Sequence, residues 1–331
     1  MSSTEVPIIA VVVPCFNEEA IFPHTLKALR DEIARLSESK EISASSYILF
    51  VDDGSRDKTW TLIENASEEY PEQVRGLKLA HNAGHQNALL AGLLTQRGKV
   101  DAMISIDADL QDDIAAFSKM VAHFRKGGAD IVFGVRSARN ADTMFKRETA
   151  GFYYRFLSLL GADVIPHHAD FRLMSDRAVR ALSEFGESHV FLRGLVVQLG
   201  FKTEIVEFER LPRLHGETKY NLSKMAGLAI DGITSMSVRP IRIIAVLGLV
   251  LFAIFVGVGI WVFTTWMSGE TVQGWTSLML LFLLISSFQI CALAVIGEYV
   301  GKIFFEAKSR PRYIIDRECN AFPHERKLAT P

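Results

Sequence analysis

The stretch ISIDADLQDDI, residues 104–114, joins an apolar run to a cluster of acids. The residues at its start and just before it are apolar and predict a short buried strand: Ala102, Met103, Ile104 and Ile106. Its other end holds four carboxylates and one amide: Asp107, Asp109, Gln111, Asp112 and Asp113. Carboxylates at the end of an inner strand repel one another and resist the loss of water. A divalent cation among them would relieve both costs, and such oxygen ligands suit Mg²⁺ or Mn²⁺, which usually bind substrate phosphates as well.

The same acids have a second interpretation. They are also compatible with a solvated acidic loop in which Asp112 or Asp113 caps the helix that follows. Because Asp-x-Asp alone is a weak motif, this stretch leaves both interpretations open.

Strands and helices alternate on both sides of this stretch. Apolar runs predict strands at residues 8–13, 47–51, 74–79, 102–106 and 130–134. Helical periodicity predicts helices between them, at about 18–36, 58–69, 85–94 and 114–126. This alternation predicts an α/β fold, a doubly wound and mostly parallel sheet with helices on both faces. Ligands of such sheets bind at the carboxyl edge, where we expect the loops 14–19, 52–57, 80–85 and 107–113.

The next part of the chain has a mixed pattern. We expect helices at 145–160, 176–184 and 190–199, and strands at 168–174 and 202–209. Residues 221–238 are predicted to form an amphipathic helix.

Two uncharged segments then follow, at about 243–267 and 275–297. At about 1.5 Å per residue, each is long enough to cross a hydrocarbon core of about 30 Å. Basic residues flank the pair on its outer sides: Arg239, Arg242, Lys302, Lys308, Arg310 and Arg312. Because positive charge is retained on the cytoplasmic side, we expect both termini and the globular domain in the cytoplasm of an integral membrane protein.

These features predict a globular domain at 1–220, a juxtamembrane helix at 221–238, a transmembrane hairpin within 239–301 and a cytoplasmic tail at 302–331. The net charge of −2 gives no reason to expect a nucleic acid partner. The three cysteines lie far apart, which favours a reducing compartment, and the start of the chain lacks the pattern of a signal peptide.

The first strand leads into PCFNEE, residues 14–19, without the glycine-rich turn of a dinucleotide site. Because a P-loop is also absent, a nucleotide would have to be bound in another way. Asp52 or Asp53 could accept hydrogen bonds from a ribose or a uracil N–H, although Asp-Gly-Ser is also ordinary turn chemistry.

Seven motifs in order resemble those of a known family: VVVPCFNEE (11–19), VDDGSRDKT (51–59), HNAGHQNALLAG (81–92), DADLQ (107–111), FGVR (133–136), DFRLMS (170–175) and GETKYN (216–221). The set resembles family two inverting glycosyltransferases. It is most similar to the polyprenyl-phosphate group, which includes dolichyl-phosphate mannose synthases and bactoprenol glucosyltransferases. The resemblance extends through the hairpin to the tail, and it implies a GT-A type fold and a sugar nucleotide donor.

Site residues follow from the resemblance, motif by motif. It implies that the nucleoside pocket includes Pro14, Asn17, Glu19 and Asp53, with Asp52 beside them. It also implies that Asp107 contacts the donor, and that Asp109 and Gln111 bind Mg²⁺ or Mn²⁺. Lys219 would close over the donor diphosphate, although a basic stretch near a membrane explains it equally well.

Three further residues are expected at the acceptor. The resemblance implies that Arg136 and Arg147 face the acceptor phosphate, which suits a bidentate guanidinium, although Arg147 could also be a solvated helix charge. Asp170 is a candidate catalytic residue that orients the sugar or the acceptor, because a phosphate with a second pKa of about 6 hardly needs a base. The alternative for Asp170 is a structural pair with Arg172.

The chain departs from the family at some positions. His81 stands where arginine is common, and Asp112, Asp113 and Ile114 follow DADLQ where the family usually has a proline. These departures weaken details of the nucleotide contacts but leave the metal assignment in place.

The resulting expectation is an inverting transfer of a hexose, most simply from UDP-glucose, to undecaprenyl phosphate or a related lipid. Its partners would be the nucleotide sugar, the lipid and the membrane, with a homo-oligomer left open. A GDP-mannose-dependent transferase and an inactive membrane-anchored scaffold are the alternatives.

Overall fold

The computed structural model describes residues 6–136, 168–187, 191–209, 237–269 and 274–320. Contacts divide the chain into two compact units. The first comprises Met1–Glu148, Val164–Lys219 and Pro311–Pro331, and the second comprises Thr149–Asp163 and Tyr220–Arg310.

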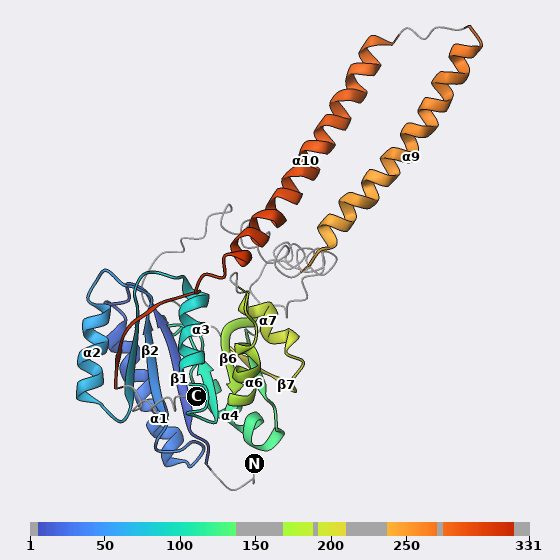
Figure 1. The fold of residues 1–331 in the computed structure, drawn as a ribbon. Helices are drawn as coiled ribbons and strands as arrows, with labels where there is room; N and C mark the ends of the chain where they lie inside the picture. Colours follow the sequence, from blue (N-terminus) through green and yellow to red (C-terminus); the bar gives the residue numbers. More distant parts are fainter. Residues whose placement is uncertain (1–5, 137–167, 188–190, 210–236, 270–273, 321–331) are drawn as a thin grey trace, which may run out of the picture. The chain divides into compact units, whose positions relative to one another are not determined.

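The first unit is built on a mixed sheet, whose described strands number eight, in the order β7-β5-β6-β4-β1-β2-β3-β8 (Figure 1). The strands are β1 Ile9–Cys15, β2 Tyr47–Asp52, β3 Val74–Leu79, β4 Ala102–Ser105, β5 Ile131–Arg136, β6 His168–Ser175, β7 Thr203–Phe208 and β8 Ile315–Cys319. The four strands β1 to β4 run parallel to their neighbours within that set, as the alternation predicted. Strand β6 is antiparallel to both β4 and β5.

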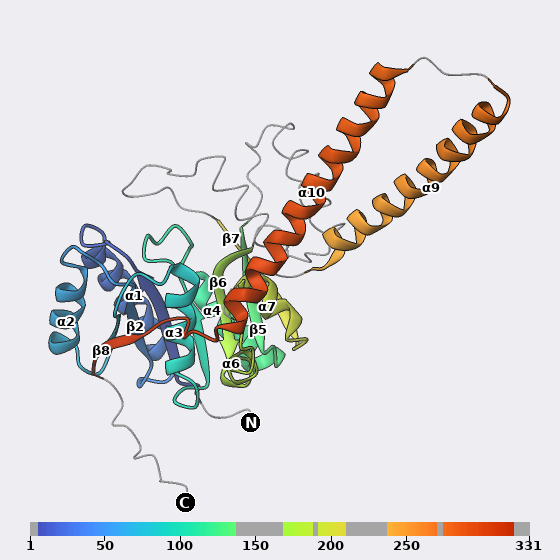
Figure 2. The ribbon, with the colours of Figure 1, turned by 45° about the horizontal axis from the view of Figure 1, so that its top comes forward.

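Helices cover both faces of this sheet (Figure 2). The helices α1 Phe22–Glu38, α2 Thr59–Glu69 and α4 Ala116–Gly127 pack on one face, around a core that includes Leu29, Ile63 and Phe117. The helices α3 His85–Thr95, α6 Asp176–Ser183 and α7 Leu192–Gln198 pack on the other, around Leu89, Val179 and Leu195. Strands β1 and β2 are buried at every position, which explains why their sequences are apolar without alternation.

Helix α3 lies unusually close to the sheet. A Cβ atom added to Gly92 would stand 2.4 Å from Cγ1 of Val12 on β1 and 2.8 Å from Cγ2 of Val51 on β2. The glycine therefore lets the helix approach the strands, and this approach places the first residue of α3, His85, over the carboxyl edge.

The structure differs from the prediction in two strands. The alternation predicted a mostly parallel sheet and gave no direction for the strand at 168–174. This strand, β6, runs antiparallel to both of its neighbours, β4 and β5. Residues 302–331 were predicted as a tail, and part of that tail forms β8, which pairs antiparallel with β3. Four of its five residues are exposed, and its sequence has no apolar run of the kind that predicted the other strands.

The second unit contains α9 Arg239–Met267 and α10 Trp275–Ala307. Both helices are long and apolar enough to cross a membrane, by length and composition. They match the predicted segments 243–267 and 275–297 and extend them at the charged ends. The predicted helix at 145–160 and most of the predicted helix at 221–238 fall outside the described residues. The predicted domain limits remain a prediction.

The close approach at Gly92 yields a stability prediction. Gly92→Ala should lower the melting temperature by a few degrees, because overpacking a core costs about 1–3 kcal/mol, against about 1 kcal/mol gained from the better helix propensity of alanine. Gly127→Ala is the matched control, since a Cβ there meets only Nδ1 of His123, at 4.0 Å. Equal melting temperatures for the two variants, measured in detergent by tryptophan fluorescence, would contradict the packing argument.

Candidate active site

Two loops at the carboxyl edge are tied together by reciprocal hydrogen bonds. The Oδ1 atom of Asn17 accepts from the backbone N–H of Arg56 at 2.9 Å, and Oε2 of Glu19 accepts from that of Lys58 at 2.9 Å. In return, the N–H of Asn17 donates to the Ser55 hydroxyl at 2.9 Å. Asn17 has a φ of 56°, a left-handed conformation that asparagine tolerates better than most residues. Asn17 and Glu19 are both exposed, so they hold the loop and also face solvent.

Asp53 connects these loops to a third one. Its carboxylate accepts the N–H groups of Ala83 at 2.7 Å and Gly84 at 3.0 Å. The turn after it brings Gly54, with a φ of 67°, against the backbone of Asn82, where a Cβ would stand 2.7 Å from the nitrogen. Asp53 is 3% exposed, so its observed role is to fix the loop that precedes His85.

Asp52 and Pro14 lie deeper. Asp52 is fully buried, and its Oδ1 accepts from the N–H of Ser55 at 3.3 Å. Burial raises the pKa of its carboxyl, and the hydrogen bonds from Ser55 oppose that shift. Pro14 is buried near the end of β1. The predicted nucleoside contacts of both residues stay predictions.

The acidic stretch makes a tight turn after β4. The hydroxyl of Thr25 donates to the carbonyl oxygen of Ala108 at 2.6 Å, and Leu110 has a left-handed φ of 47°. Asp109 is half-buried and accepts from the N–H of Gln111 at 3.3 Å, whereas Gln111 itself is 3% exposed.

Asp113 bears on the alternative interpretation of the stretch. It accepts from the N–H of Ala115 at 3.0 Å, just before α4 begins at Ala116. The side chain thus supports the turn into the helix, while Asp107 and Asp109 lie earlier in the loop. The N-cap of α4 is Ala115, which makes no side-chain capping hydrogen bond, so the prediction that Asp112 or Asp113 caps this helix is wrong.

The antiparallel pairing of β6 with β4 brings Asp170 to the same edge. Ser105, the last residue of β4, is opposite Arg172, and the chain continues from this pair to Asp107 on one side and comes from Asp170 on the other. The Ser105 hydroxyl donates to the carbonyl oxygen of Asp170 at 2.5 Å. Nε2 of His85 then lies between the two carboxylates, 3.4 Å from Oδ1 of Asp107 and 3.5 Å from Oδ2 of Asp170.

Asp107 is surrounded by like charges. Its side chain is 37% exposed, but its Oδ1 atom is buried. Desolvation, together with Asp170, Asp112 and Asp109, raises the pKa of the Asp107 carboxyl to about 6, against the opposing effect of His85. The pKa of Glu18 is also raised, by desolvation and then by Asp109, Asp57 and Asp107. The edge therefore concentrates negative charge in the way the sequence predicted.

Asp170 is held by cations on several sides. Its Oδ1 accepts from Nη2 of Arg172 at 2.7 Å, and its Oδ2 accepts from Nη2 of Arg193 at 3.0 Å. Burial alone would raise the pKa of this carboxyl, but His85, Arg172 and Arg193 outweigh it and hold the pKa well below its usual range. The pairing with Arg172 proposed from the sequence is thus present, and two further cations accompany it.

The residues present fit a hard divalent cation that is bound mainly by its substrate. Among the described residues, no three His, Cys, Asp or Glu side chains are already grouped as a metal site. Asp109 and Gln111 offer carboxylate and amide oxygens, the ligand types that Mg²⁺ and Mn²⁺ prefer. Mg²⁺ commonly uses one or two carboxylates and takes its other ligands from phosphates and water, so a protein-poor site is compatible with it.

Several predicted residues lie outside what the structure describes. Arg136 ends β5, but its side chain is not among the described ones, and neither Arg147 nor Lys219 is described at all. Conversely, sequence reasoning gave no role to His85 or Arg193. His85 lies inside the motif HNAGHQNALLAG, which could have pointed to a role, whereas Arg193 lies in none of the seven motifs.

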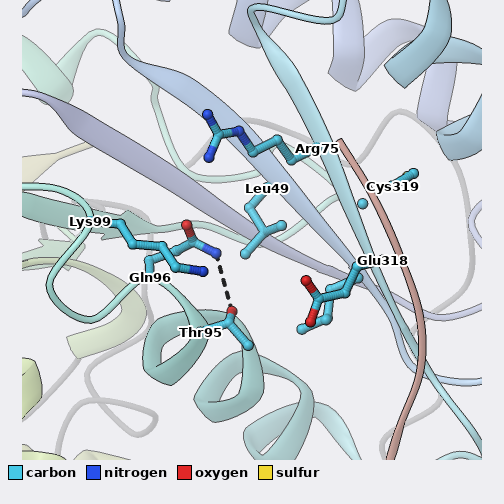
Figure 3. Close-up of a pocket in the computed structure, with 9 residues that line it drawn as sticks. Leu49, Arg75, Thr95, Gln96, Lys99, Glu318 and Cys319 are labelled. Atoms are coloured by element: carbon cyan, nitrogen blue, oxygen red, sulfur yellow. Dashed lines mark hydrogen bonds between the residues drawn. The ribbon is translucent and has the colours of Figure 1, made fainter. Parts of the chain in front are cut away.

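A separate pocket lies at the other end of the strands (Figure 3). It is lined by residues of β2, β3, β8, the end of α3 and the turn after it, including Leu49, Arg75, Gln96, Lys99 and Glu318. Its volume of about 10 Å³ suffices for a single water, so it is no candidate for a substrate site.

The mixed α/β sheet, with acids gathered at its carboxyl edge, is the arrangement expected of a GT-A type fold. The family model described as glycosyl transferase family 2 matches residues 10–183, and the chain belongs to this family.

More particular relatives cover almost the whole chain. An uncharacterized glycosyltransferase of Bacillus subtilis, YkoT, is 47% identical over 94% of this chain and 91% of its own. The bactoprenol glucosyl transferase of Shigella phage SfX is 36% identical over 93% of this chain and 98% of its own. Among solved structures, glucosyl-3-phosphoglycerate synthase from Mycobacterium tuberculosis, in complex with Mn²⁺, UDP-glucose and phosphoglyceric acid, aligns with a TM-score of 0.44 and 16% identity, over 72% of this chain and 81% of that one.

The buried pair at Asp170 yields the second prediction. Asp170→Asn leaves the guanidinium of Arg172, which is 1% exposed, without its counter-charge, and should cost about 3–5 kcal/mol. The double variant Asp170→Asn, Arg172→Met should recover much of that loss, because no buried charge is then left uncompensated. Denaturant unfolding of the two single variants and the double variant measures the coupling.

The same variants have a pH signature. The pKa of Asp170 is lower in the folded chain than in the unfolded one, so its contribution to stability is present above the unfolded value near 4 and is lost as the pH falls. We expect Asp170→Asn to flatten the acid limb of the stability curve. The pairing of Asp170 with Arg172 would be contradicted if the stability losses of the two single variants were additive and the dependence of stability on acidic pH were unchanged in Asp170→Asn.

Proposed function

We propose that this protein transfers a hexose, with inversion, from UDP-glucose to a polyprenyl phosphate such as undecaprenyl phosphate at the cytoplasmic face of a membrane. The observation that carries the proposal is the cluster at the carboxyl edge, where Asp107 and Asp170 meet across His85, beside Asp109 and Gln111. The similarity to a protein named bactoprenol glucosyl transferase over nearly the full chain supports the acceptor class.

The donor would lie across the linked loops. Pro14, Asn17, Glu19, Asp52 and Asp53 would line the nucleoside pocket, some directly and others by holding the loops in register. Asp53 is an example of a residue that would act by holding a loop, because its carboxylate already accepts two backbone N–H groups of the loop before His85. Lys219 would contact the diphosphate, and Asp107 would contact the donor from the end of β4.

Asp109 and Gln111 would hold Mg²⁺ or Mn²⁺ next to the donor. When bound, the ion supplies positive charge that stabilises the departing diphosphate. The carboxylates around Asp109 favour a cation at this place, since desolvation and neighbouring carboxylates already raise the pKa of Asp107.

The acceptor phosphate would be its own nucleophile. With a second pKa of about 6 it is largely dianionic at neutral pH, so an oxygen atom can attack the anomeric carbon without a base. Asp170 fits this scheme as a positioning residue: its low pKa and its cationic partners make it a poor proton acceptor. Arg136 and Arg147 would bind the same phosphate.

The helices α9 and α10 support a membrane-bound acceptor. The helices have 29 and 33 residues, and at about 1.5 Å per residue each is longer than the thickness of a hydrocarbon core, about 30 Å. Arg239 and Arg242 at one outer end, and Lys308 with Arg310 at the other, favour the cytoplasm for both flanks. The lipid phosphate would then lie on the same side as the donor.

Asp109 provides the direct test. Asp109→Ala should abolish release of UDP from UDP-glucose in the presence of Mn²⁺ and a polyprenyl phosphate. It should also abolish the Mn²⁺-dependent increase in melting temperature produced by UDP, while the melting temperature without ligand stays near that of the wild type.

Asp113→Ala is the matched control from the same loop. Its carboxylate supports only the turn before α4, so the variant should keep its activity and lose at most about 1 kcal/mol of stability. Near-normal turnover by Asp109→Ala would remove the metal assignment. Failure of the wild type with UDP-, GDP- and TDP-sugars would favour an inactive scaffold.

A further inference from the structure

Asp107 and Asp170 are compensated very differently, although one histidine lies between them. Asp170 is 6% exposed, and its two oxygens accept from Nη2 of Arg172 at 2.7 Å and from Nη2 of Arg193 at 3.0 Å. For Asp107, His85 is the one basic side chain within ion-pair distance in the described part of the chain, with Nε2 3.4 Å from Oδ1. Removing His85 would therefore leave Asp170 with both arginines but would take from Asp107 its ion pair.

Asp107 is anchored at one oxygen and open elsewhere. The Oδ1 atom that faces His85 is buried and has no hydrogen-bond partner among the described residues, yet the side chain as a whole is 37% exposed. The exposed surface therefore belongs to other atoms of the same side chain. A carboxylate that is held from within at one oxygen can present its remaining atoms to a ligand in a fixed orientation.

His85 is held in place at the start of α3 by the residues next to it. Gly84, which precedes it, has a φ of 90°, and its N–H donates to Oδ2 of Asp53 at 3.0 Å. On the other side, Oε1 of Gln86 accepts from the N–H of Leu192 at 2.9 Å, where α7 begins. The neighbours of His85 are thus tied to other elements, which favours one position of its backbone before any ligand binds.

The surroundings favour the charged form of the imidazole. Burial lowers the pKa of His85, but the hydrogen bond with Asp170 and the charges of Asp107 and Asp170 outweigh it, and the pKa is raised. Arg193 opposes this shift, as does the N-terminus of α3, where the helix dipole disfavours a cation. The two carboxylates thus stabilise an imidazolium at a helix end that would otherwise disfavour it.

We propose that His85 is a positioning residue of the transfer site, which holds the carboxylate of Asp107 in the orientation that binds the sugar nucleotide. The inference rests on the proposed function, in which Asp107 contacts the donor. His85 acts through Asp107, so its effect on donor affinity depends on that carboxylate being present. A purely structural histidine would instead join β4 to β6 without affecting the affinity for the donor.

A double-variant cycle tests whether the two residues act as one unit, and it does not depend on turnover. Binding of UDP-glucose with Mn²⁺, in the absence of acceptor, is measured by calorimetry for the wild type, His85→Gln, Asp107→Asn and the double variant. His85→Lys keeps a positive charge at the position, and His123→Gln is the matched control, a partly exposed histidine of α4. Melting temperatures without ligand show whether each variant is folded.

We expect His85→Gln to weaken the binding of UDP-glucose by about 10-fold, as for the loss of a charged hydrogen bond. The double variant should bind no more weakly than Asp107→Asn alone, because His85 then has no carboxylate to position. His85→Lys should recover part of the affinity through its charge, and His123→Gln should bind the donor as the wild type does.

An affinity within twofold of the wild type in a folded His85→Gln variant would overturn the proposal. So would additive losses in the double variant, since they would mean that His85 acts independently of Asp107. A wild type that binds UDP-glucose but transfers no sugar would instead contradict the proposed function, whereas additive losses in an active enzyme would contradict this inference alone.

A second measurement applies if His85→Gln does not fold or Asp107→Asn does not bind the donor. The pKa of the His85 imidazole is compared by NMR between the wild type and Asp107→Asn, and the spectrum of His85→Lys assigns the resonance. We expect a lower pKa in Asp107→Asn and a shift of the His85 resonance when the wild type binds UDP-glucose. The absence of either result would contradict the proposal.

Discussion

A buried negative charge at Asp170 organises the candidate active site. A carboxylate that is 6% exposed is tolerated only if cations and hydrogen-bond donors compensate it, and here they come from three elements. Arg172 belongs to the same strand, Arg193 to α7 and His85 to α3. The requirement to neutralise one charge therefore fixes the relative positions of β6, α7 and α3 at the carboxyl edge. Asp107 joins the group through His85, whose Nε2 atom lies 3.4 Å from Oδ1 of Asp107 and 3.5 Å from Oδ2 of Asp170.

The loops of this edge are held by polar side chains that the family resemblance also assigns to a nucleoside pocket. Asn17, Glu19 and Asp53 each accept backbone N–H groups from a neighbouring loop. Such contacts fix the loops before any ligand arrives, which reduces the entropy lost on binding. A structural role and a binding role therefore do not exclude each other for these residues.

The parallel half of the fold could be predicted because its signal is local. Strands β1 and β2 are buried on both faces and have unbroken apolar runs, and α3 begins within the motif that ends in NALLAG. The site could be predicted in part, since Asp107, Asp109 and Gln111 follow β4 directly and Asp170 lies in a family motif. What could not be predicted depends on pairings distant in sequence. The direction of β6 decides that Asp170 meets Asp107, and nothing in HADFRLMS encodes a direction. Arg193 carries no motif, and only its contact with Asp170 gives it a role.

Strand β8 shows the same limit and adds a constraint on the site. It begins at Ile315, soon after α10 ends at Ala307, and its sequence IDREC is mostly exposed and has no apolar run. The residues before it are bonded to the rest of the first unit at two points: the N–H of Ala80 donates to the carbonyl oxygen of Ile314 at 2.8 Å, and Nη2 of Arg312 donates to the carbonyl oxygen of Phe185. Ala80 opens the loop whose next residues bind Asp53 and lead to His85. The segment that follows a candidate membrane helix is thus bonded to the loop that positions the active-site histidine. In the proposed function, this covalent order would join the part of the chain that meets the lipid to the part that binds the donor.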